Sequence, residues 1–227
     1  MVDILQEQMA YYRARAAEYD EWFYRHGRYD RGEEANAQWF AEMDIVRNAL
    51  HTIQPMDSVL EVASGTGIWT GELLKLARHI TALDAASEMH AINRSKHAAA
   101  TIDFQQVDLF EWSPETSYDL VFFAYWLSHV PPEKLDAFLA KVYQATKTGG
   151  TVFMIDSRHN AYSSAENHPD PDLENHTHMR LLNDGQAYTI YKVFYTPEIL
   201  DAAFRKAGFS PNVQITENYV IYVEATK

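Results

Sequence analysis

The segment that decides the fold is Asp57-Ser58-Val59-Leu60-Glu61-Val62-Ala63-Ser64-Gly65-Thr66-Gly67-Ile68-Trp69-Thr70-Gly71. Its apolar run at 59–62 predicts a buried strand, and an amphipathic helix is expected to start near Trp69. Gly65 and Gly67 lie between the two and permit backbone angles that other residues resist. A strand, a tight glycine turn and a helix bring the backbone close to a ligand at the carboxyl end of a parallel strand.

Further strand-like runs follow in the order expected for a nucleotide-binding sheet. About 20 residues after the turn, the run 80–83 ends in Asp84, where such sheets place the acid that binds a ribose. The next run ends at Asp108. The segment 119–127 is almost wholly apolar, as a strand covered on both faces should be. This succession predicts a parallel sheet with a ligand site at its carboxyl edge.

The third glycine position separates two classes of cofactor. A dinucleotide fingerprint requires Gly-x-Gly-x-x-Gly or Ala, so that helix and strand pack closely around a pyrophosphate. Here Thr70 stands at that position, and Gly71 falls one residue late. Glu61, at the end of the strand, suits a cationic or amine-bearing ligand better than a pyrophosphate. The turn therefore favours a cofactor other than NAD.

Several segments match one known family in order and spacing over roughly residues 57–156. They resemble the class I S-adenosylmethionine-dependent methyltransferases. Two further segments, 11–20 and 123–132, look like a bacterial small-molecule subgroup of that family. Ala63 stands where many members carry a glycine. The segments that carry the family match are 59–67, Asp84, Asp108-Leu109, 118–121 and 148–150.

The resemblance implies a fold and a cofactor site. The fold is an α/β three-layer sandwich around a seven-stranded, mostly parallel, Rossmann-like sheet, with a C-terminal antiparallel strand and an N-terminal helical lid. Asp84 would bind the ribose hydroxyls, Asp108 and Leu109 the adenine edge, and the glycine turn the methionine end. Met89 would pack on adenine, or else belong to the core. The full expected set is Tyr19, Glu61, Ala63, Gly65, Gly67, Trp69, Asp84, Met89, Asp108, Leu109, Ala124 and Tyr125.

The N-terminal segment predicts an amphipathic helix over 4–23 that is rich in aromatic residues. These residues either pack in a core and interface or, as the resemblance favours for Tyr19, cap the cofactor and line a substrate cavity. In the second case the substrate contacts are Tyr11, Tyr12, Trp22 and Arg28, the last either binding a carboxylate or remaining solvated. His129 follows the fourth strand beside the expected methyl donor. It is the candidate catalytic residue, with a structural histidine as the alternative.

The rest of the chain predicts one domain over 1–227, with 1–50 as the lid and 157–185 as a mobile substrate loop. Alternation at 187–195 indicates an antiparallel strand, and 218–225 a closing strand. His176 and His178 are two residues apart, but no matching carboxylate pattern accompanies them, so we expect no metal.

Composition excludes several classes of function. The net charge of −13 argues against nucleic acid as a partner. The chain has no cysteine and no apolar stretch approaching the roughly 20 residues that span a bilayer, so we expect a cytoplasmic protein without a membrane partner. A homodimer is left open.

The expected function is methyl transfer from S-adenosylmethionine to an O or N atom of a small-molecule acceptor. Two alternatives remain at this point: a non-catalytic module that binds the cofactor, and a nicotinamide-dependent oxidoreductase, against which Thr70 argues. Phosphoryl transfer has no support, because the chain has no Gly-Lys-Ser or Gly-Lys-Thr loop.

Overall fold

A seven-stranded sheet forms the centre of the protein, whose computed structural model describes residues 4–227. The first three residues of the predicted lid lie outside this range. The strand order is β3-β2-β1-β4-β5-β9-β8, and only β9 and its partners pair in antiparallel fashion. The strands are β1 (Met56–Val62), β2 (Ala77–Asp84), β3 (Ile102–Gln106), β4 (Tyr118–Ala124), β5 (Thr146–Ser157), β8 (Ser210–Ile215) and β9 (Val220–Thr226).

Helices cover both faces of this sheet, because the central strands bury side chains on both sides. In β4, Leu120 and Phe122 pack with α3 (Glu33–His51), and α4 (Thr70–Leu73) joins the same core. Val121 and Phe123 alternate to the other face and pack with α6 (Pro132–Ala145) and α7 (Pro197–Lys206). α5 (Ser87–Lys96) lies beside β2 and β3. The α/β three-layer sandwich predicted from the sequence is confirmed.

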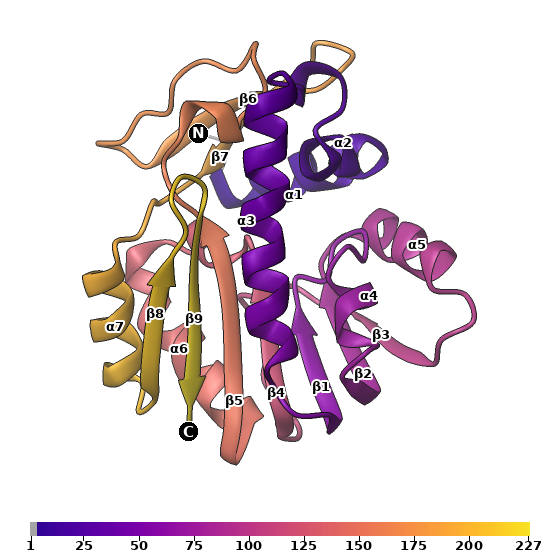
Figure 1. Cartoon of the computed structure of the whole chain (residues 1–227), viewed down its shortest axis with the longest axis vertical. Coiled ribbons are helices and arrows are strands. Elements are labelled where there is room, and N and C mark those ends of the chain that lie inside the picture. Colours follow the sequence, from indigo (N-terminus) through magenta and orange to yellow (C-terminus); the bar gives the residue numbers. More distant parts are fainter. Residues whose placement is uncertain (1–3) are drawn as a thin grey trace.

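A separate cap covers the end of the sheet at which the parallel strands finish (Figure 1). It consists of α1 (Ile4–Arg15), α2 (Tyr19–Tyr24) and a two-stranded antiparallel sheet of β6 (Thr177–Leu181) and β7 (Ala187–Tyr191). α1 packs on β7, and Glu7 Oε1 accepts a hydrogen bond of 2.6 Å from the amide of Thr189. Short 3-10 turns complete the structure at Ala16–Glu18, Gly27–Tyr29, Leu127–His129 and Ala161–Ser163.

Two predicted helices differ from the structure. The helix expected over 4–23 is interrupted at 16–18, where Glu18 faces away from the helix to bind Arg28 at 2.7 Å and the amide of Asn183 at 2.9 Å. The helix expected after the glycine turn is a single turn, because β2 already starts at Ala77 in register with Met56. Local apolar periodicity carries no information about either tertiary constraint.

The C-terminal third contains more strands than the sequence predicts. The range 157–185, predicted as a loop, includes β6, and the strand predicted over 187–195 is β7, which ends at residue 191. β8 was not predicted, because its alternation is weak and Pro211 lies inside it. Within the described residues, no helix combines the length and the apolar character needed to cross a bilayer.

Candidate active site

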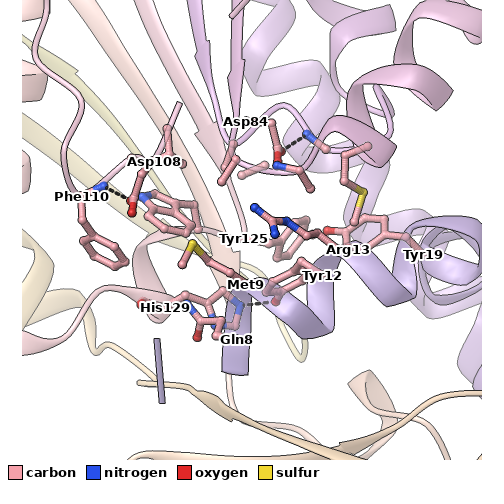
Figure 2. A pocket seen from close by; sticks show the side chains of 18 residues that line it. Gln8, Met9, Tyr12, Arg13, Tyr19, Asp84, Asp108, Phe110, Tyr125 and His129 are labelled. Atoms are coloured by element: carbon pink, nitrogen blue, oxygen red, sulfur yellow. Dashed lines mark hydrogen bonds between the residues drawn. The ribbon is translucent and has the colours of Figure 1, made fainter. Parts of the chain in front are cut away.

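Three adjoining pockets lie between the carboxyl ends of the strands and the cap. The main pocket contains about 720 Å³ of space not filled by protein atoms, which includes space open to solvent. Figure 2 shows the carboxylates of Asp84 and Asp108 on one side of it and Met9, Tyr12 and His129 of the cap side on the other. We call the second the turn pocket, around Glu61 and the glycine turn. The third is the basic pocket, lined by Arg15, Arg180 and Lys192.

The glycine turn contains residues in the left-handed backbone conformation. Ala63 and Gly65 both have positive φ, at 56° and 53°. Asp84 then fixes the turn, since its carboxylate accepts hydrogen bonds from the amides of Gly65 at 2.9 Å and Ala86 at 2.8 Å. Ala63, Gly65 and Asp84 all line the main pocket. The alanine that departs from the family pattern thus keeps the left-handed conformation that a glycine adopts more easily.

Gly67 contacts α5 rather than lining a pocket, unlike Gly65. A Cβ atom built on it would lie 2.4 Å from Oδ1 of Asn93 on α5, and its φ is 86°. The carbonyl of Gly67 also lies 2.9 Å from Nε2 of His97. Gly67 therefore allows the turn to pack closely against α5, and it lines none of the three pockets.

Glu61 is the buried acid of the turn pocket, with 2% of its surface exposed. Burial raises its pKa to about 8, although the hydroxyl of Thr70 donates a hydrogen bond of 2.6 Å to it. The same hydroxyl accepts a hydrogen bond from Nδ2 of Asn93 at 2.9 Å. Thr70, which occupies the third position of the dinucleotide fingerprint, therefore links the acid to α5.

Two buried polar atoms in the same pocket as Glu61 have no hydrogen-bond partner among the described residues: Oγ of Ser64 and Nε1 of Trp69. Both residues line the turn pocket. An acid together with two unpaired hydrogen-bonding groups matches the ammonium and carboxylate of an amino acid. The pocket thus fits the methionine end of S-adenosylmethionine.

The part of the main pocket around Asp108 is both acidic and apolar. Oδ1 of Asp108 accepts a hydrogen bond of 2.9 Å from the amide of Phe110, which fixes the carboxylate beside the pocket (Figure 2). Leu109 and Met89 are buried there, at 3% and 2% exposure. Acid groups near an apolar surface suit a nucleoside.

Tyr125 forms the floor between all three pockets. It has a positive φ of 57°, its ring packs edge-on against Trp22 with centroids 4.6 Å apart, and burial raises its pKa well above the ordinary value. Tyr19 from the cap also borders all three pockets, and Ala124 borders the main and turn pockets. These residues separate the cofactor side from the basic pocket.

His129 lies where the main and basic pockets meet. Its Nδ1 is 2.6 Å from the carbonyl of Tyr191, which can only accept, so Nδ1 carries the proton. Nε2 then accepts the hydrogen bond from the hydroxyl of Tyr12 at 2.7 Å (Figure 2). Burial, followed by the nearby charge of Lys192, lowers the pKa of His129 well below its ordinary value. His129 is a neutral hydrogen-bond acceptor here.

Two predicted substrate residues lie outside the pockets. Tyr11 is fully buried in the cap, where its ring contacts Tyr188. Arg28 is bound to Glu18 and to the carbonyl of Leu181. Neither lines the three pockets, whereas Tyr12 and Trp22 do. We leave Tyr11 and Arg28 out of the proposed substrate site.

Several pocket residues were not expected from the sequence. Met9 and Arg13 are one helical turn apart and flank Tyr12, so the spacing of helix α1 would have indicated them. Arg180 and Lys192 carry no such signal, because their place depends on how the β6–β7 hairpin packs. Over residues 4–227, no group of three His, Cys, Asp or Glu side chains could hold a metal ion.

Comparison with known proteins identifies the family. Residues 59–150 match the sequence profile of a methyltransferase domain. The structure resembles that of a DhpI–SAM–HEP complex, with a TM-score of 0.82 and 32% sequence identity over 100% of this chain and 99% of that one. A DhpI–SAH complex gives a TM-score of 0.76 and 32% identity over 98% and 96%. An uncharacterized methyltransferase of Bacillus cytotoxicus is 24% identical over 92% of this chain and 96% of its own length.

The chain therefore belongs to the class I S-adenosylmethionine-dependent methyltransferases. Its cofactor is S-adenosylmethionine, as the prediction from the sequence states. The turn pocket and main pocket fit that molecule, with a buried acid and unpaired donors at one end and acid groups beside apolar side chains at the other. These relatives give no support to the nicotinamide alternative.

Proposed function

We propose that this methyltransferase acts on an O or N atom of a small-molecule acceptor that enters through the basic pocket. The observation that carries this proposal is that the basic pocket adjoins the main pocket: both are lined by Tyr12, Tyr19, Tyr125 and His129. An acceptor held there lies directly beside the cofactor side of the site. The cap covers the strand ends (Figure 1), and both pockets are lined by side chains of the cap together with residues at or after the strand ends.

In this proposal the cofactor residues divide by chemistry. Glu61 binds the ammonium of the methionine end, with Ser64 and Trp69 as donors to its carboxylate. Asp84 accepts hydrogen bonds from the ribose hydroxyls. Each of its oxygens accepts only one backbone amide and therefore keeps a second lone pair for the ribose. Asp108, Leu109 and Met89 surround the adenine.

The reaction needs alignment more than acid–base catalysis. When bound, S-adenosylmethionine supplies a methyl group on a positively charged sulfur that is already a good leaving group. The main task of the chain is to hold the nucleophilic atom in line with that methyl. The low pKa of His129 makes it a weak base at neutral pH, so it suits an acceptor that requires little deprotonation. We assign it, with Tyr12, to orienting the acceptor through the Nε2 end of the ring.

An acceptor screen tests this function. The purified protein is incubated with S-adenosylmethionine and pools of small hydroxyl, amino and acid compounds, and release of S-adenosylhomocysteine is measured. We expect turnover with a small molecule and a loss of at least tenfold in Trp22→Ala, since Trp22 lines the basic pocket. Turnover only with a protein or nucleic acid would contradict a small-molecule acceptor.

A further inference from the structure

The basic pocket gathers three cationic side chains from distant parts of the chain. Arg15 comes from the end of α1, Arg180 from β6 and Lys192 from the residue after β7. This concentration stands out in a protein whose net charge is −13. The packing of the β6–β7 hairpin against α1 brings the three together.

Arg15 is a buried cation without a carboxylate partner. It is 7% exposed, and its guanidinium lies over the ring of Tyr19 at 4.8 Å. Its Nη2 donates to the hydroxyl of Tyr29 at 3.2 Å, while Nε is buried and unpaired. Among the described residues, no ion pair neutralises it. Stacking on aromatic rings offsets part of the cost of burial but leaves the charge uncompensated.

Arg180, like Arg15, forms no ion pair with a carboxylate among the described residues. Its Nη1 donates to Oγ of Ser164 at 3.1 Å and to Nδ1 of His168 at 2.9 Å. His168 is neutral, because burial and the charge of Arg180 lower its pKa to about 3. Its Nε2 lies 3.2 Å from the carbonyl of Leu181, so Nε2 carries the proton and Nδ1 accepts from Arg180. Nε of Arg180 is buried without a partner. Both ligands of the guanidinium are therefore uncharged.

Among residues 4–227, the one ion pair in this cluster joins Lys192 to Asp156. Lys192 is 6% exposed and lies 3.2 Å from Oδ1 of Asp156 and 2.7 Å from Oγ of Ser128. Asp156 also accepts hydrogen bonds from the amides of Ser128 and Ser157. Among the described residues that line or pair with this pocket, three cations against one anion leave an excess positive charge, and a buried excess charge is costly unless a ligand pairs with it.

We propose that the acceptor carries a compact oxyanion, a carboxylate or a phosphate-type group, bound between Arg15, Arg180 and Lys192. The proposal rests on the methyl transfer assigned above and names the substrate class of that site. Guanidinium groups bind such anions through paired N–H donors, and both arginines have an Nε–H to offer. The tyrosines shared with the main pocket place the anion next to the methyl donor.

The ionisation of the cluster supports this assignment. Burial lowers the pKa of Lys192, Asp156 raises it, and the neighbouring charge of Arg180 lowers it again. Burial likewise lowers the pKa of Arg180, which the charge of Arg15 lowers further. The tyrosines around Arg15, by contrast, raise its pKa despite burial. An anion between the three side chains therefore relieves mainly the repulsion that acts on Lys192 and Arg180.

The test titrates two anions into the protein already saturated with S-adenosylhomocysteine. Inorganic phosphate and acetate are added at constant ionic strength, and binding is followed by calorimetry for the wild type, Arg180→Met and a surface control, Arg205→Gln on α7. We expect at least tenfold weaker anion binding in Arg180→Met and no change in Arg205→Gln. Arg180→Lys keeps the positive charge but loses the paired N–H donors of the guanidinium, so its anion affinity should fall between those of the other two variants. This variant replaces Arg180→Met in the test if the methionine variant does not fold.

The outcomes separate the two proposals. Binding of phosphate alone assigns a phosphate-type group, and binding of acetate assigns a carboxylate. If S-adenosylhomocysteine binds normally but neither anion does, or if both bind equally well to Arg180→Met, the oxyanion site is wrong while the methyltransferase function stands. If S-adenosylhomocysteine itself does not bind, the proposed function fails first.

Discussion

Glu61 is a carboxyl group that the fold buries beside the glycine turn. Burial raises its pKa to about 8 from an ordinary value of 4.5, so the folded protein binds a proton there that the unfolded chain releases. The stabilisation is complete below the ordinary pKa and is lost as the pH rises through 8. An ammonium bound beside it reverses this preference, because it favours the ionised form.

Replacing Glu61 by glutamine therefore changes stability and binding in opposite directions. In urea unfolding between pH 6 and 9, we expect the free energy of unfolding of the wild type without ligand to fall with rising pH, and that of Glu61→Gln to fall less. By calorimetry, the variant should bind S-adenosylhomocysteine at least tenfold more weakly, as expected for loss of a charged hydrogen bond. An unchanged pH slope in the variant would show that another group is responsible.

The site residues that could be predicted are those that directly follow a strand recognisable in the sequence. Gly65, Asp84 and Asp108 follow predicted strands, so the parallel topology alone brings them to one edge of the sheet. Gly67 was expected to hold the cofactor, yet its missing Cβ makes room for Asn93. A sequence does not reveal which side of a turn needs the space.

At the scale of elements, the cap was predicted less well than the sheet. The central sheet strands are recognised from apolar runs, and the seven-stranded, mostly parallel arrangement was implied by the family resemblance. The β6–β7 hairpin is short, polar and held by side-chain contacts, such as that of Gln8 with the amide of Tyr191 at 3.1 Å. The part of the site that recognises the acceptor depends on it, so Arg180 and Lys192 could not be found from the sequence.

The connection of α3 to the final hairpin depends on Glu42, which is 1% exposed. Its oxygens accept hydrogen bonds from the amides of Asn218 and Tyr219 at 2.9 and 2.8 Å and from the hydroxyl of Thr216. Burial raises its pKa, but these hydrogen bonds and that of Gln38 outweigh it and lower the pKa below the ordinary value. Its contribution to stability is thus present at neutral pH and lost as the pH falls through its folded pKa.

We expect Glu42→Ala to lower the free energy of unfolding by about 3 kcal/mol, because it leaves several buried donors unpaired. The exposed Glu34→Ala on the same helix should cost less than about 0.5 kcal/mol. Both are measured by urea denaturation at pH 7. Equal small losses would mean that the turn at 216–219 is held by the strand pairing alone.

At the scale of the whole molecule, charge is divided between surface and interior. The net charge of −13 belongs to the chain as a whole, while the acceptor side of the site is positive. The negative total argues against a nucleic acid partner, and the positive pocket is the basis of the proposed small anionic acceptor. The division suits a methyltransferase that admits a charged metabolite-sized molecule and excludes charged polymers.

The most direct test of the account is calorimetric titration of S-adenosylhomocysteine, with NAD as the comparison ligand and Asp84→Ala as the comparison protein. We predict binding of S-adenosylhomocysteine alone, and an affinity at least tenfold lower in the folded Asp84→Ala variant, whose side chain can no longer hold the turn or accept a hydrogen bond from a ribose. Binding of NAD in its place, or equal affinity in the wild type and the variant, would contradict the site described.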